Sequence, residues 1–245
     1  IGEIENSGWE FELRGDIIRN ENFRWNAGVT FSTYDSEVLQ LADDNDLFLD
    51  YAGYSGLRVG EEVHTFFLSR YVGVNPANGQ ALFLDENDNV TTTNTDNVFL
   101  SGKTPFAQFD GGFNTSVSYK GFDLTADFYF KGGNYIYNRV ESQHLTDGTS
   151  ANDNQRLDAF NYWQQPGDTN VLPNPVVNGY NGAVNANNRN VSSGTSTRYL
   201  QRGDYIRLRN LQIGYSVPSQ YLEKVPFTQI RMYFSGTNLW TYIPY

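Results

Sequence analysis

The feature that most restricts the fold of this chain is a strict alternation of apolar and polar residues in segments about ten residues long. A period of two places alternate side chains on opposite faces of a β-strand. The pattern therefore predicts antiparallel strands, each with one apolar and one polar face. It is clearest at 23–32, where Phe23, Trp25, Ala27, Val29 and Phe31 alternate with Arg24, Asn26, Gly28, Thr30 and Ser32.

The alternating segments form three pairs, at about 9–33, 106–133 and 204–241. In the third pair, the apolar residues of 211–217 share one face, whereas Ile206 and Leu208 are out of phase with them. One residue near Arg209-Asn210 must therefore be absorbed, and a β-bulge is the usual way to do so.

The connectors between these segments are very unequal in length. Short connectors lie within the pairs, at 20–22, 120–121 and 218–228, and residues 219–224 suggest a helical turn. Two long connectors, roughly 35–105 and 134–203, separate the pairs. Short turns at one end and long loops at the other are typical of outer-membrane barrels, whose spanning strands take about 9–11 residues. In such a barrel the apolar side chains would face lipid and the polar ones the lumen.

A soluble antiparallel sandwich is the alternative, because its strands also alternate. The charged polar faces, the aromatic apolar faces and the long, one-sided loops favour the membrane barrel. Six strands are too few to close one, since single-chain barrels begin at about eight. The fold class predicted is therefore all-β: part of an antiparallel transmembrane β-barrel with long extracellular loops.

Composition narrows the classes of function. The chain has 245 residues, a formal net charge of −11 and no cysteine. An acidic chain is a poor nucleic-acid binder, since that binding depends on Lys and Arg neutralising phosphates. Without cysteine there is no disulfide, thiolate nucleophile or thiolate metal site. No apolar run approaches a membrane helix, no signal peptide is visible, and the chain reads as the middle of something longer.

Six motifs occur in order along nearly the whole chain. They are GEIENSGWEFEL at 2–13, RVGEEV at 58–63, NPANG at 75–79 with DENDN at 85–89, GFN at 112–114 with YKGFDL at 119–124, GDYIRLRNL at 203–211 with GYSVP at 214–218, and SGTNLWT at 235–241. Together these motifs resemble the SusC-like (RagA-like) branch of TonB-dependent outer-membrane transporters from Bacteroidetes. Departures from the family pattern are small: Glu62 replaces the usual Pro, and Asp88-Asn89 replaces Gly-Asn.

The resemblance implies a barrel of roughly 22 strands around an N-terminal plug, located in the outer membrane. It implies active import of oligosaccharides or peptides with a SusD-like surface lipoprotein, powered by TonB–ExbB–ExbD. All of 1–245 would then belong to the C-terminal part of the barrel, with the plug and the TonB box outside it. A passive porin or structural barrel without energy coupling is the alternative. Substrate-binding residues and the choice between glycan and peptide stay open.

Catalytic and metal sites find little support in the sequence. The only histidines are His64 and His144, and no HExxH, GxSxG or phosphate-binding loop accompanies them. We therefore expect no enzyme activity and no cofactor. Residues 85–96 faintly resemble a calcium loop, but Val90 stands where the sharp turn needs Gly and Asp96 replaces the bidentate Glu. A polar Asx-rich hairpin turn is the favoured interpretation.

Four sets of side chains are candidates for other roles. Polar-face residues would line the lumen: Arg24, Asn26, Asp123 and Asp127. Aromatic residues of 134–203 either contact substrate or lid, or pack within the loop: Tyr135, Tyr137, Tyr162, Trp163 and Tyr180. Aromatic residues near strand ends would sit at the lipid headgroups: Trp9, Trp25, Trp240, Tyr242 and Tyr245. Acidic residues of 35–105 form a solvated surface or bind divalent ions: Asp35, Glu37, Asp43, Asp44, Asp46, Asp50, Glu61, Glu62, Asp85, Glu86, Asp88 and Asp96.

Overall fold

The protein is described by a computed structural model, and the prediction of an all-β, antiparallel fold is confirmed. The structure describes residues 2–42, 45–48, 54–92, 94, 96–145, 147–148, 154–175, 195–223 and 225–244. The chain divides into two compact units, which we describe separately. Among the described residues, no helix has the length and apolar character needed to cross a bilayer.

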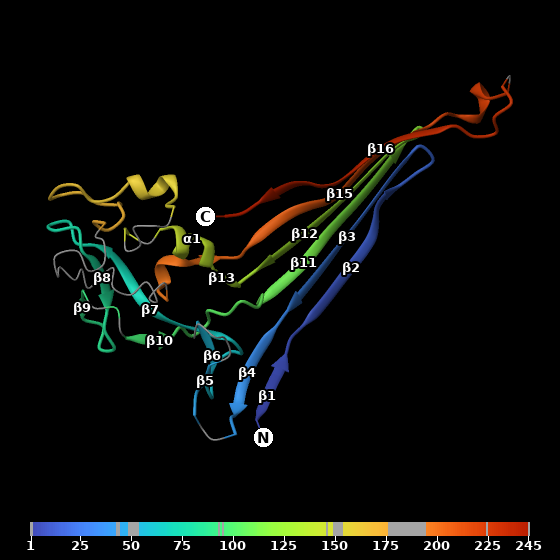
Figure 1. The fold of residues 1–245 in the computed structure, drawn as a ribbon. Coiled ribbons are helices and arrows are strands. Elements are labelled where there is room, and N and C mark those ends of the chain that lie inside the picture. The colour runs from blue at the N-terminus through green and yellow to red at the C-terminus, as the bar shows by residue number, and fades with distance from the viewer. Residues whose placement is uncertain are drawn as a thin grey trace. The chain divides into compact units, whose positions relative to one another are not determined.

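One unit is built on six long antiparallel strands, which we call the long sheet (Figure 1). The strands lie in the sheet in the order in which they occur along the chain, as an up-and-down meander. They are β2 (Glu10–Arg19), β3 (Phe23–Thr33), β11 (Phe109–Tyr119), β12 (Phe122–Gly132), β15 (Tyr205–Ser216) and β16 (Arg231–Tyr242).

The register of the long sheet sorts its side chains by polarity. Phe113 on β11 lies opposite Val29 on β3 and Phe128 on β12, so apolar residues share one face. The next residue, Asn114, lies opposite Gly28 and Asp127 on the other face. The alternation in the sequence therefore produces one continuous apolar face and one continuous polar face.

The β-bulge predicted in the third pair is present. Asp127 pairs with Asn210 and Phe128 with Leu208, which leaves Arg209 as the extra residue. On the other side of β15, Leu208 pairs with Trp240 and Asn210 with Thr237. The extra residue restores the phase, so that Leu208 and the apolar residues after Asn210 occupy the same face.

The short connectors have the local chemistry of turns. Lys120 and Gly121, between β11 and β12, both have positive φ, 46° and 91°, as a two-residue hairpin of the primed type requires. Before β3, the Asn20 side-chain oxygen accepts hydrogen bonds from the backbone N–H groups of Asn22 and Phe23. The helical turn expected after Pro218 is a short 3₁₀-helix, η4 (Ser219–Tyr221), although Lys224 lies outside the described residues.

The second unit, here the loop unit, consists mainly of 37–105 and 135–201. The sequence predicts these stretches as loops, yet they contain short strands around a core of Phe66, Leu68 and Leu100.

Most strands of the loop unit are short. β7 (Thr65–Val74) pairs with β6 (Ser55–Leu57), β8 (Ala81–Leu84) and β10 (Asn97–Phe99), and outer strands are β5 (Leu47–Phe48) and β9 (Val90–Thr91). Further elements are β13 (Tyr135–Tyr137), paired with β14 (Leu200–Arg202), α1 (Arg139–His144), η1 (Leu157–Phe160) and η3 (Thr197–Tyr199). Finally, β1 (Glu3–Ser7) pairs with β4 (Asp35–Gln40).

Candidate functional site

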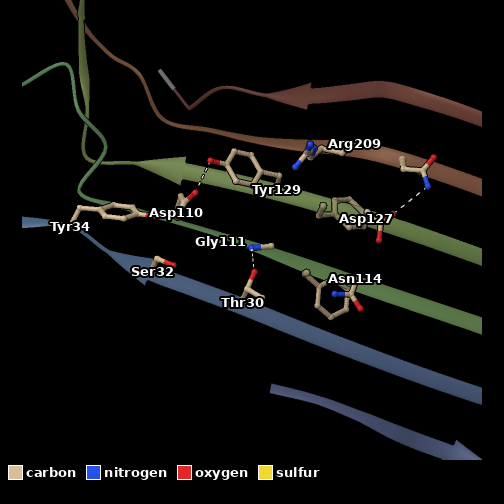
Figure 2. A pocket seen from close by; sticks show the side chains of 13 residues that line it. Thr30, Ser32, Tyr34, Asp110, Gly111, Asn114, Asp127, Tyr129 and Arg209 are labelled. Carbon is tan, nitrogen blue, oxygen red and sulfur yellow. Dashed lines mark hydrogen bonds between the residues drawn. The ribbon is translucent and has the colours of Figure 1, made fainter. Parts of the chain in front are cut away.

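The polar face of the long sheet carries a hollow of about 600 Å³. It lies over β3, β11, β12 and β15, and Figure 2 shows polar side chains from these strands converging on it. The polar and charged lining residues are Thr30, Ser32, Tyr34, Asp110, Asn114, Asp127, Tyr129, Arg209 and Asn210. The hollow is a candidate binding site on this face.

Asp110 organises one side of the hollow. Its carboxylate accepts a hydrogen bond of 2.9 Å from the Tyr34 hydroxyl and one of 2.7 Å from the Tyr129 hydroxyl (Figure 2). Asp110 and Tyr129 share the polar face because each alternates with apolar or small neighbours along its strand. The two tyrosine rings are thereby fixed beside the hollow.

The opposite side of the hollow is shaped by the bulge in β15. Arg209 is the extra residue of that bulge, and its guanidinium carbon lies 5.5 Å from the centre of the Tyr129 ring. The next residue, Asn210, donates a hydrogen bond of 3.2 Å to Asp127. The bulge therefore places a cation and an amide in succession on the polar face, where a regular strand would place only one of them.

The four residues predicted to line the lumen have different surroundings. Asp127 lines the hollow, whereas Asp123 forms an ion pair of 2.7 Å with Arg231 on β16. Arg24 and Asn26 lie on the polar face of β3, opposite Ser118 and Ser116 of β11. The sequence does not predict that Asp110, Tyr129 and Arg209 line this hollow. The available signal for Arg209 was its position beside the predicted bulge.

The two histidines and the acidic turn at 85–89 make local polar contacts within the loop unit. His64 lies in the loop unit with Nδ1 3.4 Å from the Ser55 hydroxyl, and Nδ1 of His144 lies 3.2 Å from the Asn154 carbonyl oxygen. One carboxylate oxygen of Asp85 accepts 2.8 Å hydrogen bonds from the backbone N–H groups of Asn87 and Asn89. The Asn89 N–H group, with further donors, lowers the pKa of Asp85. This geometry is that of an Asx-rich hairpin turn.

No group of three or more potential metal-ligating side chains gathers anywhere in the part of the chain that the structure describes. Two of the acidic residues of 35–105 instead form ion pairs with arginines. Asp46 pairs with Arg58 at 2.6 Å, and Asp88 pairs with Arg70. Three others, Asp43, Asp44 and Asp50, lie outside the described residues. The described pairs support a solvated surface held by local contacts.

Several aromatic residues of 134–203 pack within the loop unit. The Tyr137 ring stacks on the Tyr54 ring with centres 4.3 Å apart, and Tyr135 packs against the core. The Trp163 indole N–H donates a 3.0 Å hydrogen bond to the Pro76 carbonyl oxygen. For these residues the structure favours packing within the loop over ligand contact. Tyr162 bridges to Leu172, whereas Tyr180 lies outside the described residues.

The aromatic residues expected at headgroup level also have defined neighbours. The Trp25 indole N–H donates a 3.0 Å hydrogen bond to the Thr115 hydroxyl. Trp240 and Tyr242 stack with ring centres 6.3 Å apart and are about half exposed, and Trp9 is 83% exposed. Tyr245 is not among the described residues. Large exposed rings with a polar edge suit a boundary between lipid and water, and that role stays a prediction.

The amino-acid sequence is similar to curated TonB-dependent receptors. It is 30% identical over its whole length to TonB-dependent receptor P3 of Formosa agariphila, and 29% identical over 93% of its length to receptor P39 of that organism. It is 24% identical over 88% of its length to TonB-dependent receptor SusC of Bacteroides thetaiotaomicron. The chain spans only 25%, 25% and 21% of these relatives. No family model matches it.

Solved structures share the fold. The chain superposes over 100% of its length on 26% of a chain in the structure of the RagAB peptide transporter, with a TM-score of 0.82 and 21% identity. The RagAB peptide importer in its open-open state gives a TM-score of 0.80 at 20% identity. At these identities the similarity shows the fold alone.

The continuous antiparallel sheet and the sequence matches define an all-β segment of the TonB-dependent receptor class. Within that class the segment is SusC-like, as its motifs predicted.

Proposed function

We propose that this segment forms part of an outer-membrane barrel that actively imports oligosaccharides or peptides, together with a SusD-like surface lipoprotein. One observation carries the proposal most directly: the long sheet has one continuous apolar face and one continuous polar face. The names of the relatives add the dependence on TonB. RagAB, whose structure is similar, is a peptide transporter and supplies a precedent for peptide transport in another protein.

The apolar face supports a location in lipid. Leu13, Phe122 and Phe234 lie on this face, and each has more than half of its surface exposed. Exposing a large apolar side chain to water costs about 1.5–3 kcal/mol relative to burial, whereas hydrocarbon removes that cost. The edges at β2 and β16 would pair with further strands, because unpaired backbone groups are costly in hydrocarbon.

Energy coupling and substrate transport would be properties of the whole transporter, of which this chain is one segment. TonB–ExbB–ExbD would act through a region outside this chain, and the lumen would be lined by the polar face. We propose no catalytic role and no cofactor for these residues. A passive porin or structural barrel is the second candidate, because the same two-faced sheet would serve it equally well.

Two measurements test this proposal. In the full-length transporter in its native host, removing TonB should abolish uptake of fluorescent oligosaccharides or peptides. Uptake unchanged without TonB would favour the passive porin. Spin labels at Val29 and Phe128 should report acyl chains, and labels at Asn26 and Asp127 should report water. The reverse pattern would contradict the membrane orientation.

A further inference from the structure

We propose that Arg207 and Arg209, on the polar face of β15, bind a carboxylate group of the imported substrate. This inference rests on the proposed import function and names the chemistry of one of its sites. The bulge inserts Arg209 between Leu208 and Asn210, so that Arg209 lies on the polar face two positions after Arg207. Arg207 lies on the polar face because it pairs with Tyr129 on β12.

Both guanidinium groups are held by tyrosine rings. The guanidinium carbon of Arg207 lies 4.9 Å from the centre of the Tyr205 ring, and that of Arg209 lies 5.5 Å from the centre of the Tyr129 ring. The two rings are themselves 6.0 Å apart, and the Tyr129 hydroxyl is fixed by Asp110. Cation–π contacts orient a guanidinium without consuming all its N–H donors. The pair is therefore positioned before any ligand arrives.

Neither guanidinium has a counter-ion among the described residues, whereas eight other arginines there form ion pairs with Asp or Glu. Arg207 does donate a 3.0 Å hydrogen bond from Nε to the Thr241 hydroxyl, which leaves its terminal nitrogens available. Two like charges on neighbouring positions repel each other. An anion between them would relieve that repulsion.

Nearby acidic groups are already engaged. Asp110 accepts hydrogen bonds from two tyrosines and lies opposite Lys131 in the register, and Asp127 accepts one from Asn210. Counting Lys131 with the two arginines gives three cations against these two carboxylates. The local excess of positive charge contrasts with the net charge of −11 for the chain.

A carboxylate is an anion that suits this arrangement. The planar fork of a guanidinium matches two carboxylate oxygens, and such charge-assisted pairs are about twice as strong as neutral hydrogen bonds. Beside Arg209, the hollow offers the hydroxyls of Thr30 and Ser32 and the amide of Asn114 for a polar chain that carries the carboxylate. Uronic-acid sugars and acidic peptides share this chemistry.

The test measures binding to the purified full-length transporter in detergent. The probes are trigalacturonate and triglutamate, each beside its neutral methyl ester, so the two arms distinguish sugar from peptide. We expect at least one acid to bind more tightly than its ester. The double variant Arg207→Gln with Arg209→Gln should weaken binding of that acid by about 10- to 100-fold and leave the ester unchanged. Double replacement by Lys keeps the charge but loses the fork, so we expect a smaller loss.

Arg14→Gln is the matched control, because Arg14 lies on the same polar face but already pairs with Glu12 at 2.5 Å. It should leave affinity for the acids unchanged. Anomalous migration of unboiled samples shows that each variant is folded. The inference is overturned if neither acid binds more tightly than its ester, or if Arg14→Gln weakens binding as much as the double variant. Binding does not require TonB, so failure of active import would appear separately, as uptake that persists without TonB.

Discussion

The long sheet and the loop unit stabilise themselves in opposite ways. On the six strands of the long sheet, the only apolar side chain that is buried among the described residues is that of Ala126. In the loop unit, by contrast, Leu68 is completely buried and packs with Phe66 and Leu100. The loop unit also buries the ion pair between Arg198 and Asp147.

This contrast shows which unit carries its own core. The loop unit gains free energy by removing its apolar side chains from water, as an ordinary globular domain does. The long sheet gains most of its order from backbone hydrogen bonds between strands and leaves its apolar face without a protein partner among the described residues. Its stability therefore depends on the solvent around that face. Mutations specific to each unit test this difference in the source of stability.

The largest effect should come from Arg198→Met in the loop unit. Arg198 donates hydrogen bonds of 2.5 and 2.8 Å to the two carboxylate oxygens of Asp147, and both side chains are about nine-tenths buried. Removing the arginine leaves a buried carboxylate without its partner, which costs about 3–5 kcal/mol. Hydrogen exchange in the full-length protein should show the loop unit opening while protection of the long sheet persists.

The control for this effect is the double variant Arg198→Met with Asp147→Leu. Because it removes both charges, it should be markedly less destabilising than Arg198→Met alone. Equal destabilisation by the two variants would show that packing of Arg198 against Tyr71 and Tyr199, rather than its charge, provides the stability.

The second effect should come from a charge placed on the apolar face of the long sheet. Val29 lies on that face, so Val29→Arg should cost about 2–4 kcal/mol in a bilayer. Thr30→Arg is the matched variant, because Thr30 is the next residue on the same strand and faces the polar side. It should cost much less. Unfolding in lipid vesicles measures both, and equal costs would contradict a lipid-facing apolar face.

The sequence predicts the long sheet far better than it predicts the loop unit. Alternation over ten or more residues is a strong local signal, and it locates the strands and even the bulge at Arg209. Strands such as β6 and β10 have only three residues, too few to establish a period. Their place in the structure depends on contacts between distant segments, such as the bridge from Ser69 to Ser196, which no local pattern reveals.

The candidate site could be predicted only in part, for a related reason. The alternation places Asp127 on the polar face, but it does not distinguish the residues that converge there from those that lie apart. Asp110 meets Tyr129 because β11 and β12 pair in register, and it meets Tyr34 because Tyr34 directly follows β3, the other partner of β11. A pairing register is a property of the whole sheet, so the hollow becomes visible only once the strands are aligned.

The smallest effect should come from pH acting on the surface of the loop unit. Arg58 donates hydrogen bonds of 3.0 and 2.6 Å to the Asp46 carboxylate, and this contact lowers the pKa of Asp46 from its ordinary value of 3.8. Because the folded pKa is the lower one, the stabilisation is present above pH 3.8 and is lost as the pH falls through the folded pKa. Both side chains are partly exposed, so the contribution of this ion pair to stability should stay below about 1 kcal/mol.

Hydrogen exchange near Asp46 and Arg58, followed from pH 5 to pH 2.5, should show this loss of stability in the wild type and not in Asp46→Asn. A loss of the same size in the variant would mean that other carboxylates govern the acid stability of the loop unit.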